Sequence, residues 1–228
     1  MIVIITSLLT IFFFLFSGIA SAKPYGSNLC ANDSSYHCYK VKRKDSWKSL
    51  FPNPDERDVV MRINRTNNQL YPGMRISIPN NINTNPLTYA PISNKIDAPG
   101  QKTIIVSLSK LAFGAYDADG TLEHWGPVSG GRGYCPDIHR KCTSPIGNFA
   151  IYNKEGAGCK STKFPVGRGG APMPYCMYFH NGFALHGSYE VPGYNASHGC
   201  IRMFVNDAQW LNQEFTEGAG KVAVIIRN

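Results

Sequence analysis

The chain has 228 residues, and 43% of them are hydrophobic. This length allows one substantial hydrophobic core plus a small module, and the lack of internal repeats or low-complexity tracts excludes a repeat array. The net charge of +8 lies entirely after residue 22 and suits an anionic polymer or surface as partner.

Residues 1–22 carry no charged side chain and contain an apolar run from Ile2 to Phe16. They end in Ala20-Ser21-Ala22, a small-x-small pattern, so we predict a secretory signal peptide that is cleaved before Lys23. The alternative is a retained membrane anchor, because only the amino terminus supplies positive charge ahead of the run. No later segment is apolar enough to span a membrane. Export, together with the scattered basic residues, disfavours nucleic acid as the partner.

Residues 23–36 form an N-terminal segment, and residues 37–80 are predicted to form a compact α+β module. The predicted elements are a strand around Tyr39 and Val41, a helix capped by Asp45-Ser46, a helix around Val59–Ile63, a turn at Leu70–Met74 and a closing strand at Arg75–Pro79.

This strand–helix–helix–strand order resembles the LysM peptidoglycan-binding module. Two sequence elements carry the resemblance, Asp-Ser-Trp-x-x-Leu from Asp45 and Leu-x-Pro-Gly-x-x-Ile-x-Ile-Pro from Leu70. The match departs at Phe51–Asp55, where prolines shorten the first helix. The resemblance implies glycan binding, and the alternative is a spacer that packs against the rest of the chain and binds nothing.

Residues 81–99 are rich in Asn, Pro and Ser and are predicted to be a linker. From residue 100 to residue 228 short β-like runs alternate with turns, so we expect a mostly β domain with one or two helices. Asp119-Gly120 and Asn181-Gly182 are hairpin turn signals, and Asn206 is predicted to cap a helix over Asp207–Phe215. The expected strands are Ile104–Leu108, Phe113–Tyr116, Gly147–Tyr152, Tyr175–Phe179, Phe183–His186 and Val222–Ile226.

Seven cysteines in an exported chain suggest three disulfides and one free thiol. Proximity in sequence favours Cys30–Cys38, Cys135–Cys142 and Cys159–Cys176, although the last two pairs could be exchanged. A zinc site at Cys135, His139 and Cys142 is the alternative, but this spacing fits no common zinc pattern. We therefore expect no metal and no other cofactor.

The most informative segment runs from His186-Gly187-Ser188 to Ser197-His198-Gly199-Cys200-Ile201-Arg202. A thiol attacks only as thiolate, and a neighbouring imidazole can take its proton. Glycine beside a nucleophile lets backbone N–H groups approach a substrate carbonyl, as an oxyanion hole requires. A disulfide would remove the nucleophile, so Cys200 is the natural free thiol. The pattern indicates acyl transfer through a thioester.

This segment resembles the signature of the YkuD-type L,D-transpeptidases, which cross-link bacterial peptidoglycan. Other blocks resemble the family in the same order, over roughly residues 100 to 228; they are Lys102–Val106 with Leu111–Tyr116, Gly126–Gly131, Thr143–Ile151 with one extra serine, Met173–Tyr175 and Phe183–His186. The resemblance implies a β-sandwich or barrel-like domain that acts on stem peptides.

The resemblance also implies roles for individual residues. Cys200 is the expected nucleophile and His186 the general base and acid, oriented by the backbone carbonyl of Gly187. If the two histidines were reversed, His198 would be the base. Support of the oxyanion region is expected from Ser197, His198 and Gly199. Substrate binding is expected from Arg202, Asn181 and Tyr175, with a surface ion pair as the alternative role for Arg202.

The expected function is that of an exported L,D-transpeptidase of the periplasm or cell wall. It would form cross-links, or attach a wall protein, through a Cys200 thioester. The expected partners are peptidoglycan stem peptides and glycan, and the chain is expected to be a monomer. Three alternatives stay open, namely an L,D-carboxypeptidase that uses water as acceptor, a papain- or NlpC-type hydrolase, and a non-catalytic peptidoglycan-binding protein. In papain-type hydrolases the cysteine usually precedes the histidine, whereas here His186 precedes Cys200.

Overall fold

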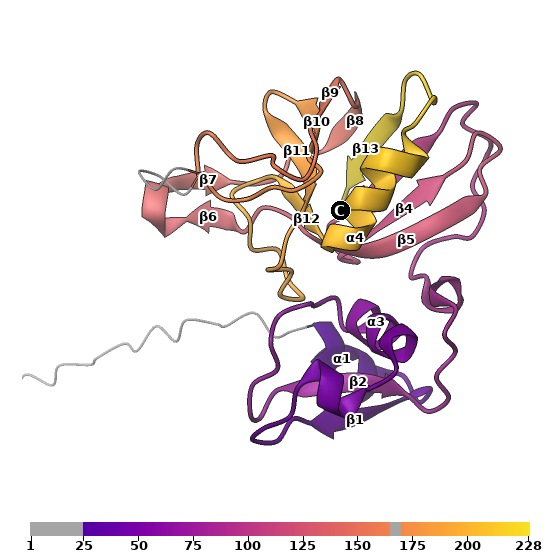
Figure 1. Cartoon of the computed structure of the whole chain (residues 1–228), viewed down its shortest axis with the longest axis vertical. Helices are drawn as coiled ribbons and strands as arrows, with labels where there is room; N and C mark the ends of the chain where they lie inside the picture. The colour runs from indigo at the N-terminus through magenta and orange to yellow at the C-terminus, as the bar shows by residue number, and fades with distance from the viewer. Residues whose placement is uncertain (1–24, 165–169) are drawn as a thin grey trace, which may run out of the picture.

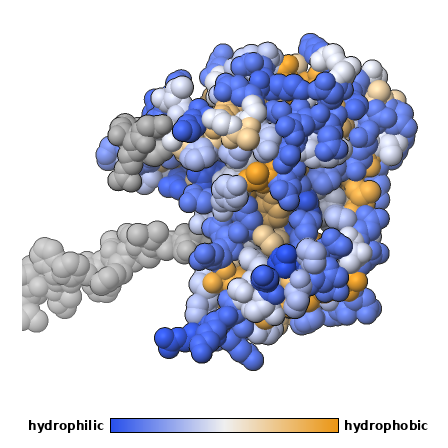
Figure 2. Space-filling model, viewed as in Figure 1, coloured by the Kyte–Doolittle hydropathy of each residue, from blue (hydrophilic) through white to orange (hydrophobic). Residues whose placement is uncertain are grey.

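The computed structural model describes residues 25–164 and 170–228, so the predicted signal peptide lies outside the described residues. Two parts lie against each other, an N-terminal module and a larger β-rich C-terminal domain (Figure 1). The face drawn in Figure 2 is mainly hydrophilic, with hydrophobic residues in small separate patches. In the described part of the chain, no helix is long and apolar enough to cross a membrane.

The N-terminal module has the predicted strand–helix–helix–strand order, preceded by a helix that the sequence did not suggest. Its elements are α1 (Tyr25–Asn32), β1 (Tyr36–Lys40), α2 (Trp47–Leu50), α3 (Pro54–Ile63) and β2 (Arg75–Pro79). Strands β1 and β2 pair antiparallel. Ser46 caps α2 through a capping box with Ser49. Helix α1 lies in the N-terminal segment, residues 23–36, for which no element was predicted, and Ser77 Oγ on β2 donates to Gly26 O at 2.6 Å.

The C-terminal domain is built on one nine-stranded sheet, in agreement with the predicted mostly β class. The strand order is β8-β13-β3-β4-β5-β12-β11-β10-β9. The pairs β13–β3 and β11–β12 are parallel, and the other neighbours are antiparallel. The sheet curls into a half-barrel. The curl brings Phe149 on β8 close to Phe179 on β10, with 5.4 Å between the centroids of their rings.

Six strands agree with the predicted runs to within two residues. They are β3 (Thr103–Ser107), β4 (Ala112–Tyr116), β8 (Gly147–Ala150), β10 (Met177–His180), β11 (Phe183–Gly187) and β13 (Ala223–Arg227). The predicted runs did not include β5 (Leu122–Ser129), β9 (Asn153–Lys154) or β12 (Ile201–Met203). A separate hairpin, β6 (Gly133–Cys135) and β7 (Arg140–Cys142), projects from the domain (Figure 1).

One helix covers the sheet, and its start corrects the prediction. Helix α4 (Val205–Trp210) continues into a π-helical turn, η3 (Leu211–Phe215), and Ala208, Leu211 and Phe215 are buried in the core. Phe204 is the N-cap, so Asn206 lies within the first turn and does not cap the helix. The helix starts at Val205, two residues before the predicted start. Strand β12 ends at Met203, so the chain turns directly into the helix, whose residues Asp207 and Ala208 are buried.

The predicted linker, residues 81–99, is not a free tether. It contains a short 3₁₀ helix, η1 (Pro86–Tyr89), and its backbone accepts hydrogen bonds from the C-terminal domain. Trp125 Nε1 donates to Pro86 O at 2.6 Å, and the Tyr116 hydroxyl donates to Ser93 O at 2.8 Å. Its apolar side chains Leu87, Ile92 and Ile96 pack against the cluster that contains Tyr116. The segment is therefore part of the folded structure.

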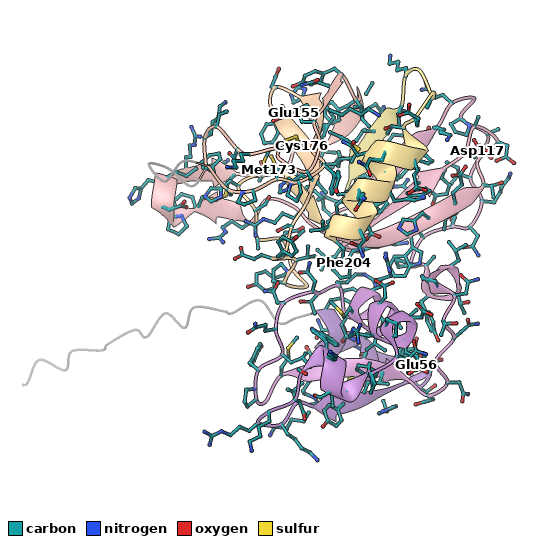
Figure 3. The ribbon with its side chains drawn as sticks, viewed as in Figure 1. Glu56, Asp117, Glu155, Met173, Cys176 and Phe204 are labelled. Carbon is teal, nitrogen blue, oxygen red and sulfur yellow. A yellow bond between two sulfur atoms is a disulfide. The ribbon has the colours of Figure 1, made fainter. Side chains whose placement is uncertain are left out.

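A buried ion pair joins the module to the C-terminal domain. Arg62 on α3 donates to both carboxylate oxygens of Asp207 on α4, at 3.0 and 2.7 Å, and His124 Nε2 lies 2.8 Å from the same carboxylate. Burial alone would raise the pKa of Asp207, but Arg62 and His124 outweigh it and lower the pKa. The guanidinium also lies 5.8 Å from the ring centre of Phe204, which Figure 3 labels at this junction.

A second arginine fixes the chain where it leaves α3. Arg65 adopts a left-handed backbone conformation with φ of +56°. Its guanidinium lies 4.6 Å from the ring of Tyr25 and 4.9 Å from the ring of Trp125. Burial lowers its pKa to about 10. Because Tyr25 belongs to the module and Trp125 to β5, this stack fastens the two parts together.

Candidate active site

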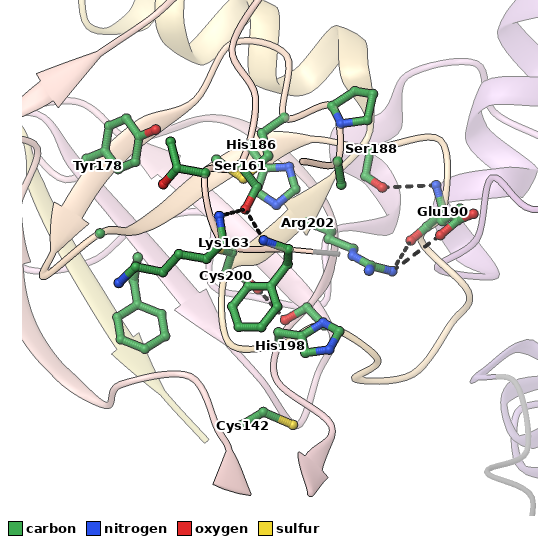
Figure 4. Close-up of a pocket in the computed structure, with 18 of the residues that line it drawn as sticks. Cys142, Ser161, Lys163, Tyr178, His186, Ser188, Glu190, His198, Cys200 and Arg202 are labelled. Carbon is green, nitrogen blue, oxygen red and sulfur yellow. Dashed lines mark hydrogen bonds and ion pairs between the residues drawn. The ribbon is translucent and has the colours of Figure 1, made fainter. Parts of the chain in front are cut away.

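A pocket of about 760 Å³ is lined by His186, near the end of β11, and by Cys200, directly before β12 (Figure 4). Its walls come from the β6–β7 hairpin, the loop before β10, the loop after β11 and the turn before β12. The polar and reactive side chains among its lining residues include Arg140, Lys141, Lys163, Tyr178, Asn181, His186, Ser188, Glu190, Ser197, His198, Cys200 and Arg202.

Strand register brings the two expected catalytic residues to one face of the sheet. Strands β11 and β12 are parallel, with Leu185 opposite Ile201 and His186 opposite Arg202. Cys200 is therefore level with Ala184. Since side chains alternate along a strand, Ala184 and His186 share a face, and Cys200 shares it with them. Both His186 and Cys200 line the pocket.

The imidazole of His186 is held in one orientation and one tautomer. The residue is 6% exposed, and Nδ1 lies 2.9 Å from Gly187 O. A carbonyl oxygen only accepts, so Nδ1 carries the proton and Nε2 is the free acceptor of the neutral ring. Burial and the charge of Arg202, opposed by the Gly187 hydrogen bond, lower the pKa of His186 to about 4. The ring is therefore neutral near pH 7.

Cys200 is the free cysteine, and it is half-buried. Burial raises the pKa of its thiol, while a backbone hydrogen bond from Ala184 and the charge of Arg202 oppose the rise. With His186 also neutral, the resting site holds a thiol beside an imidazole and not a thiolate–imidazolium pair. The thiol would lose its proton only as it attacks.

The protonation states predict how Cys200 reacts with a small alkylating agent. We expect its alkylation rate with iodoacetamide to rise about tenfold per pH unit between pH 6 and 8, because only the thiolate reacts and its pKa lies above this range. Mass spectrometry of the Cys200 peptide gives the rate at each pH. A rate that is already high and flat below pH 7 would contradict the neutral pair and indicate a preformed thiolate.

Hydroxyl groups fix the turn that carries Cys200. Ser197 Oγ donates to Cys200 O at 2.6 Å and accepts from the Gly199 N–H at 2.9 Å. Ser144 Oγ donates to Gly199 O at 2.8 Å. Gly199 has a φ of +128°, and a Cβ there would lie 2.4 Å from the Phe183 ring, so only glycine fits. The Gly199 N–H donates to Ser197 Oγ, so Gly199 supports the turn that carries Cys200.

His198 turns toward the β6–β7 hairpin. Its Nε2 lies 2.7 Å from Asp137 Oδ2, and its ring stacks on Phe164 with centroids 4.4 Å apart. A hydrogen bond from His198 lowers the pKa of Asp137. The ring thus links two loops across the pocket mouth. This placement favours a supporting role for His198 and leaves the base position to His186.

The six other cysteines form the three disulfides that proximity favoured, Cys30–Cys38, Cys135–Cys142 and Cys159–Cys176. Because Cys135 and Cys142 are bonded to each other, they offer no thiolates for the alternative zinc site. The second disulfide closes the β6–β7 hairpin, and the third closes the loop before β10. Both bridged loops contribute residues to the pocket.

The expected substrate-binding residues separate into two groups. Asn181 and Arg202 line the pocket, and the Arg202 guanidinium lies 3.8 Å from the Glu190 carboxylate and 3.3 Å from Glu190 O. Arg202 therefore has both the pocket position and the ion pair that was its alternative. Tyr175 is not among the lining residues. It has a φ of +58° and packs against the hydrophobic core, which corrects its expected role.

Several residues at the site were missed by sequence reasoning. Ser144 is the extra serine in the Thr143–Ile151 block, and that insertion was its one visible signal. Asp137 and Phe164 gave no local signal, because their partner His198 is far along the chain. Asn67 belongs to the N-terminal module but contacts the loop after β11, and nothing near it in the sequence pointed there.

The C-terminal domain is similar to known proteins in sequence and in fold. Residues 101–226, more than half of the chain, match the model of the L,D-transpeptidase catalytic domain, YkuD. No curated protein sequence matches significantly. The chain is similar in fold to a crystal structure of the L,D-transpeptidase from Xylanimonas cellulosilytica, with a TM-score of 0.53, 24% identity, and coverage of 74% of this chain and 77% of that chain.

Two other solved structures are more distant. An L,D-transpeptidase from Stackebrandtia nassauensis gives a TM-score of 0.46 at 20% identity, over 76% of this chain and 67% of that chain. L,D-transpeptidase 3 from Mycobacterium tuberculosis, in complex with a faropenem-derived adduct, gives 0.45 at 22% identity, over 56% and 60%. On the match of residues 101–226, the chain belongs to the L,D-transpeptidase (YkuD) family.

Proposed function

We propose that the chain is an exported cysteine L,D-transpeptidase that cross-links peptidoglycan stem peptides through a thioester on Cys200. The observation that carries this proposal is that the free, half-buried Cys200 thiol and the neutral His186 line one pocket. Three disulfides among the described residues support export to an oxidising compartment, the periplasm or cell wall.

In the acylation step, Cys200 Sγ attacks the carbonyl carbon of the L-centre residue that precedes a terminal D-amino acid. The thiol proton passes to Nε2 of His186, and the Gly187 carbonyl stabilises the imidazolium through Nδ1–H. The oxyanion is bound by backbone N–H groups of the turn. Because Ser197 occupies the Gly199 N–H, the candidates are those of His198 and Cys200.

Collapse of the tetrahedral intermediate breaks the peptide bond. His186 returns its proton to the leaving D-amino acid, and the acyl group remains on Cys200 as a thioester. An amine from a second stem peptide then attacks the thioester and gives one proton to His186 as the new amide forms. The Cys200 thiolate leaves and recovers that proton, which restores the starting state.

The L,D-carboxypeptidase alternative uses the same site, with water in place of the acceptor amine. Product analysis separates the two activities. We expect mature protein (residues 23–228) with tetrapeptide-stem muropeptides to yield cross-linked dimers and free D-amino acid, detected by mass spectrometry. Tripeptide monomers without dimers would replace the proposal with a carboxypeptidase. No product at all would favour a binding protein.

We further propose that the module at residues 37–80 is LysM-like and binds glycan. Its support is the strand–helix–helix–strand order with an antiparallel β1–β2 pair. The chain bearing Cys200→Ala should sediment with insoluble peptidoglycan and be displaced by peptide-free glycan chains. Displacement by stem peptides alone would assign the binding to the pocket and leave the module as a spacer.

A further inference from the structure

The loop after β11 reaches down from the C-terminal domain and lies against the N-terminal module (Figure 1). Its first residues, Ser188, Tyr189 and Glu190, line the pocket. Its next residue, Val191, is fully buried. One wall of the candidate active site is thus a loop whose outer side is covered by a different part of the chain.

A single side chain of the module holds this loop at two points. Asn67 Nδ2 donates to Ser188 O at 2.7 Å, and Asn67 Oδ1 accepts from the Val191 N–H at 2.8 Å. The Asn67 backbone N–H also donates to Val191 O at 3.1 Å. The amide therefore spans the segment from Ser188 to Val191 and fixes the peptide groups on both sides of Tyr189 and Glu190.

Neighbouring contacts continue the attachment in both directions. Thr66 forms a bridge with Pro192, and the Tyr25 N–H donates to Gly193 O at 3.1 Å. The left-handed turn at Arg65 directs Thr66 and Asn67 toward the loop. Arg65 itself is stacked between Tyr25 and Trp125, so Asn67 projects from a fixed platform.

The segment from Ser188 to Val191 contacts residues next to both His186 and Cys200. Ser188 follows Gly187, whose carbonyl orients His186, and the Ser188 N–H donates to Met203 O at 2.8 Å. Glu190 meets Arg202 through its carboxylate and its carbonyl. The Ser188–Met203 bond already fixes the Gly187 carbonyl, so loss of Asn67 would move the Tyr189–Glu190 wall more than the imidazole.

We propose that Asn67 is a positioning residue for the active site, and that the N-terminal module builds the substrate-binding wall of the pocket. The inference rests on the proposed function, since it assigns the wall to stem-peptide binding. The module would thereby act on substrate affinity without contributing a group to the reaction.

Kinetics of the full mature chain test the proposal. For Asn67→Ala we expect the donor KM to rise about tenfold and kcat to stay within about threefold, because two hydrogen bonds that shape the wall are lost. Alkylation of Cys200 by iodoacetamide should be unchanged. Asn80→Ala is the matched control, because Asn80 donates to Ser34 O within the module and should leave both constants at wild-type values.

Hydrogen exchange separates this proposal from the proposed function. The Val191 amide should exchange at least about tenfold faster in Asn67→Ala, whether or not stem peptides are substrates. Asn67→Asp keeps the acceptor for Val191 but sets a carboxylate oxygen against Ser188 O, which repels it, so its KM should rise at least as far as that of Asn67→Ala. An unchanged KM, or a kcat that falls with KM constant, would overturn the positioning role. Wild-type protein that turns over no stem peptide would overturn the proposed function instead.

Discussion

Replacement of Cys200 with alanine is expected to reduce turnover of stem peptides by about 10⁴-fold or more. The proposed reaction has no other nucleophile, since the six remaining cysteines are held in disulfides. Binding should survive, because the Asn181 and Arg202 positions are unchanged. Initial rates of dimer formation, measured by mass spectrometry, give the ratio.

A second variant and a stability measurement serve as controls for Cys200→Ala. Cys200→Ser keeps the size and the hydrogen-bonding capacity of the side chain but has a poorer nucleophile, so it should also lose most activity. The melting temperatures of both variants should stay close to that of wild type, because the thiol is half-buried and the turn is held by Ser197 and Ser144. Activity within tenfold of wild type in Cys200→Ala would exclude the thioester route.

The largest effect on stability is expected from Asp207→Asn. Asp207 is 1% exposed, and its carboxylate accepts from Arg62 and His124. The asparagine would leave the Arg62 guanidinium, itself 5% exposed, with only the partly exposed Asp58 as counter-charge. Breaking a buried ion pair from one side costs about 3–5 kcal/mol. For a chain of this size that lowers the melting temperature by about 6–20 °C.

The double variant Arg62→Met with Asp207→Leu isolates the origin of that loss. It removes both charges together, so it should recover much of the stability lost by Asp207→Asn. Asp119→Asn is the matched surface control, because Asp119 pairs with Lys95 where both side chains are exposed, and it should melt near wild type. Thermal unfolding, followed by circular dichroism, gives the melting temperatures of wild type and the three variants. A wild-type melting temperature for Asp207→Asn would show that the charge of Asp207 contributes little to stability.

Local sequence patterns predicted much of the fold because the relevant interactions are local. Apolar runs such as Ile104–Leu108 became buried strands, and Asn181-Gly182 became a hairpin turn with both φ angles positive. Ser46 caps α2, as the Asp45-Ser46 signal predicted. The helix α1 was missed, because its stability comes from packing on β2, a strand far along the chain.

The residues of the candidate site also fall into those that a local pattern predicted and those that only the structure showed. His186 and Cys200 were recognisable because their chemistry and spacing are written in one short segment. What the sequence did not show came mainly from tertiary contacts. Tyr175 packs against the hydrophobic core, and Arg62 pairs with Asp207 across 145 positions of sequence. No local pattern states which distant group will complete a buried hydrogen bond, so Asn67 was also invisible before the structure.

The most direct test of the central claim is the intact mass of the enzyme during turnover. Wild-type protein mixed with a tetrapeptide donor, without acceptor, and quenched in acid should gain the mass of the donor minus its terminal D-amino acid. Proteolysis should place that mass on the peptide that contains Cys200. Addition of acceptor should remove it as dimers appear. Turnover with the acyl group on another residue, or with no covalent adduct under any quench condition, would contradict the account.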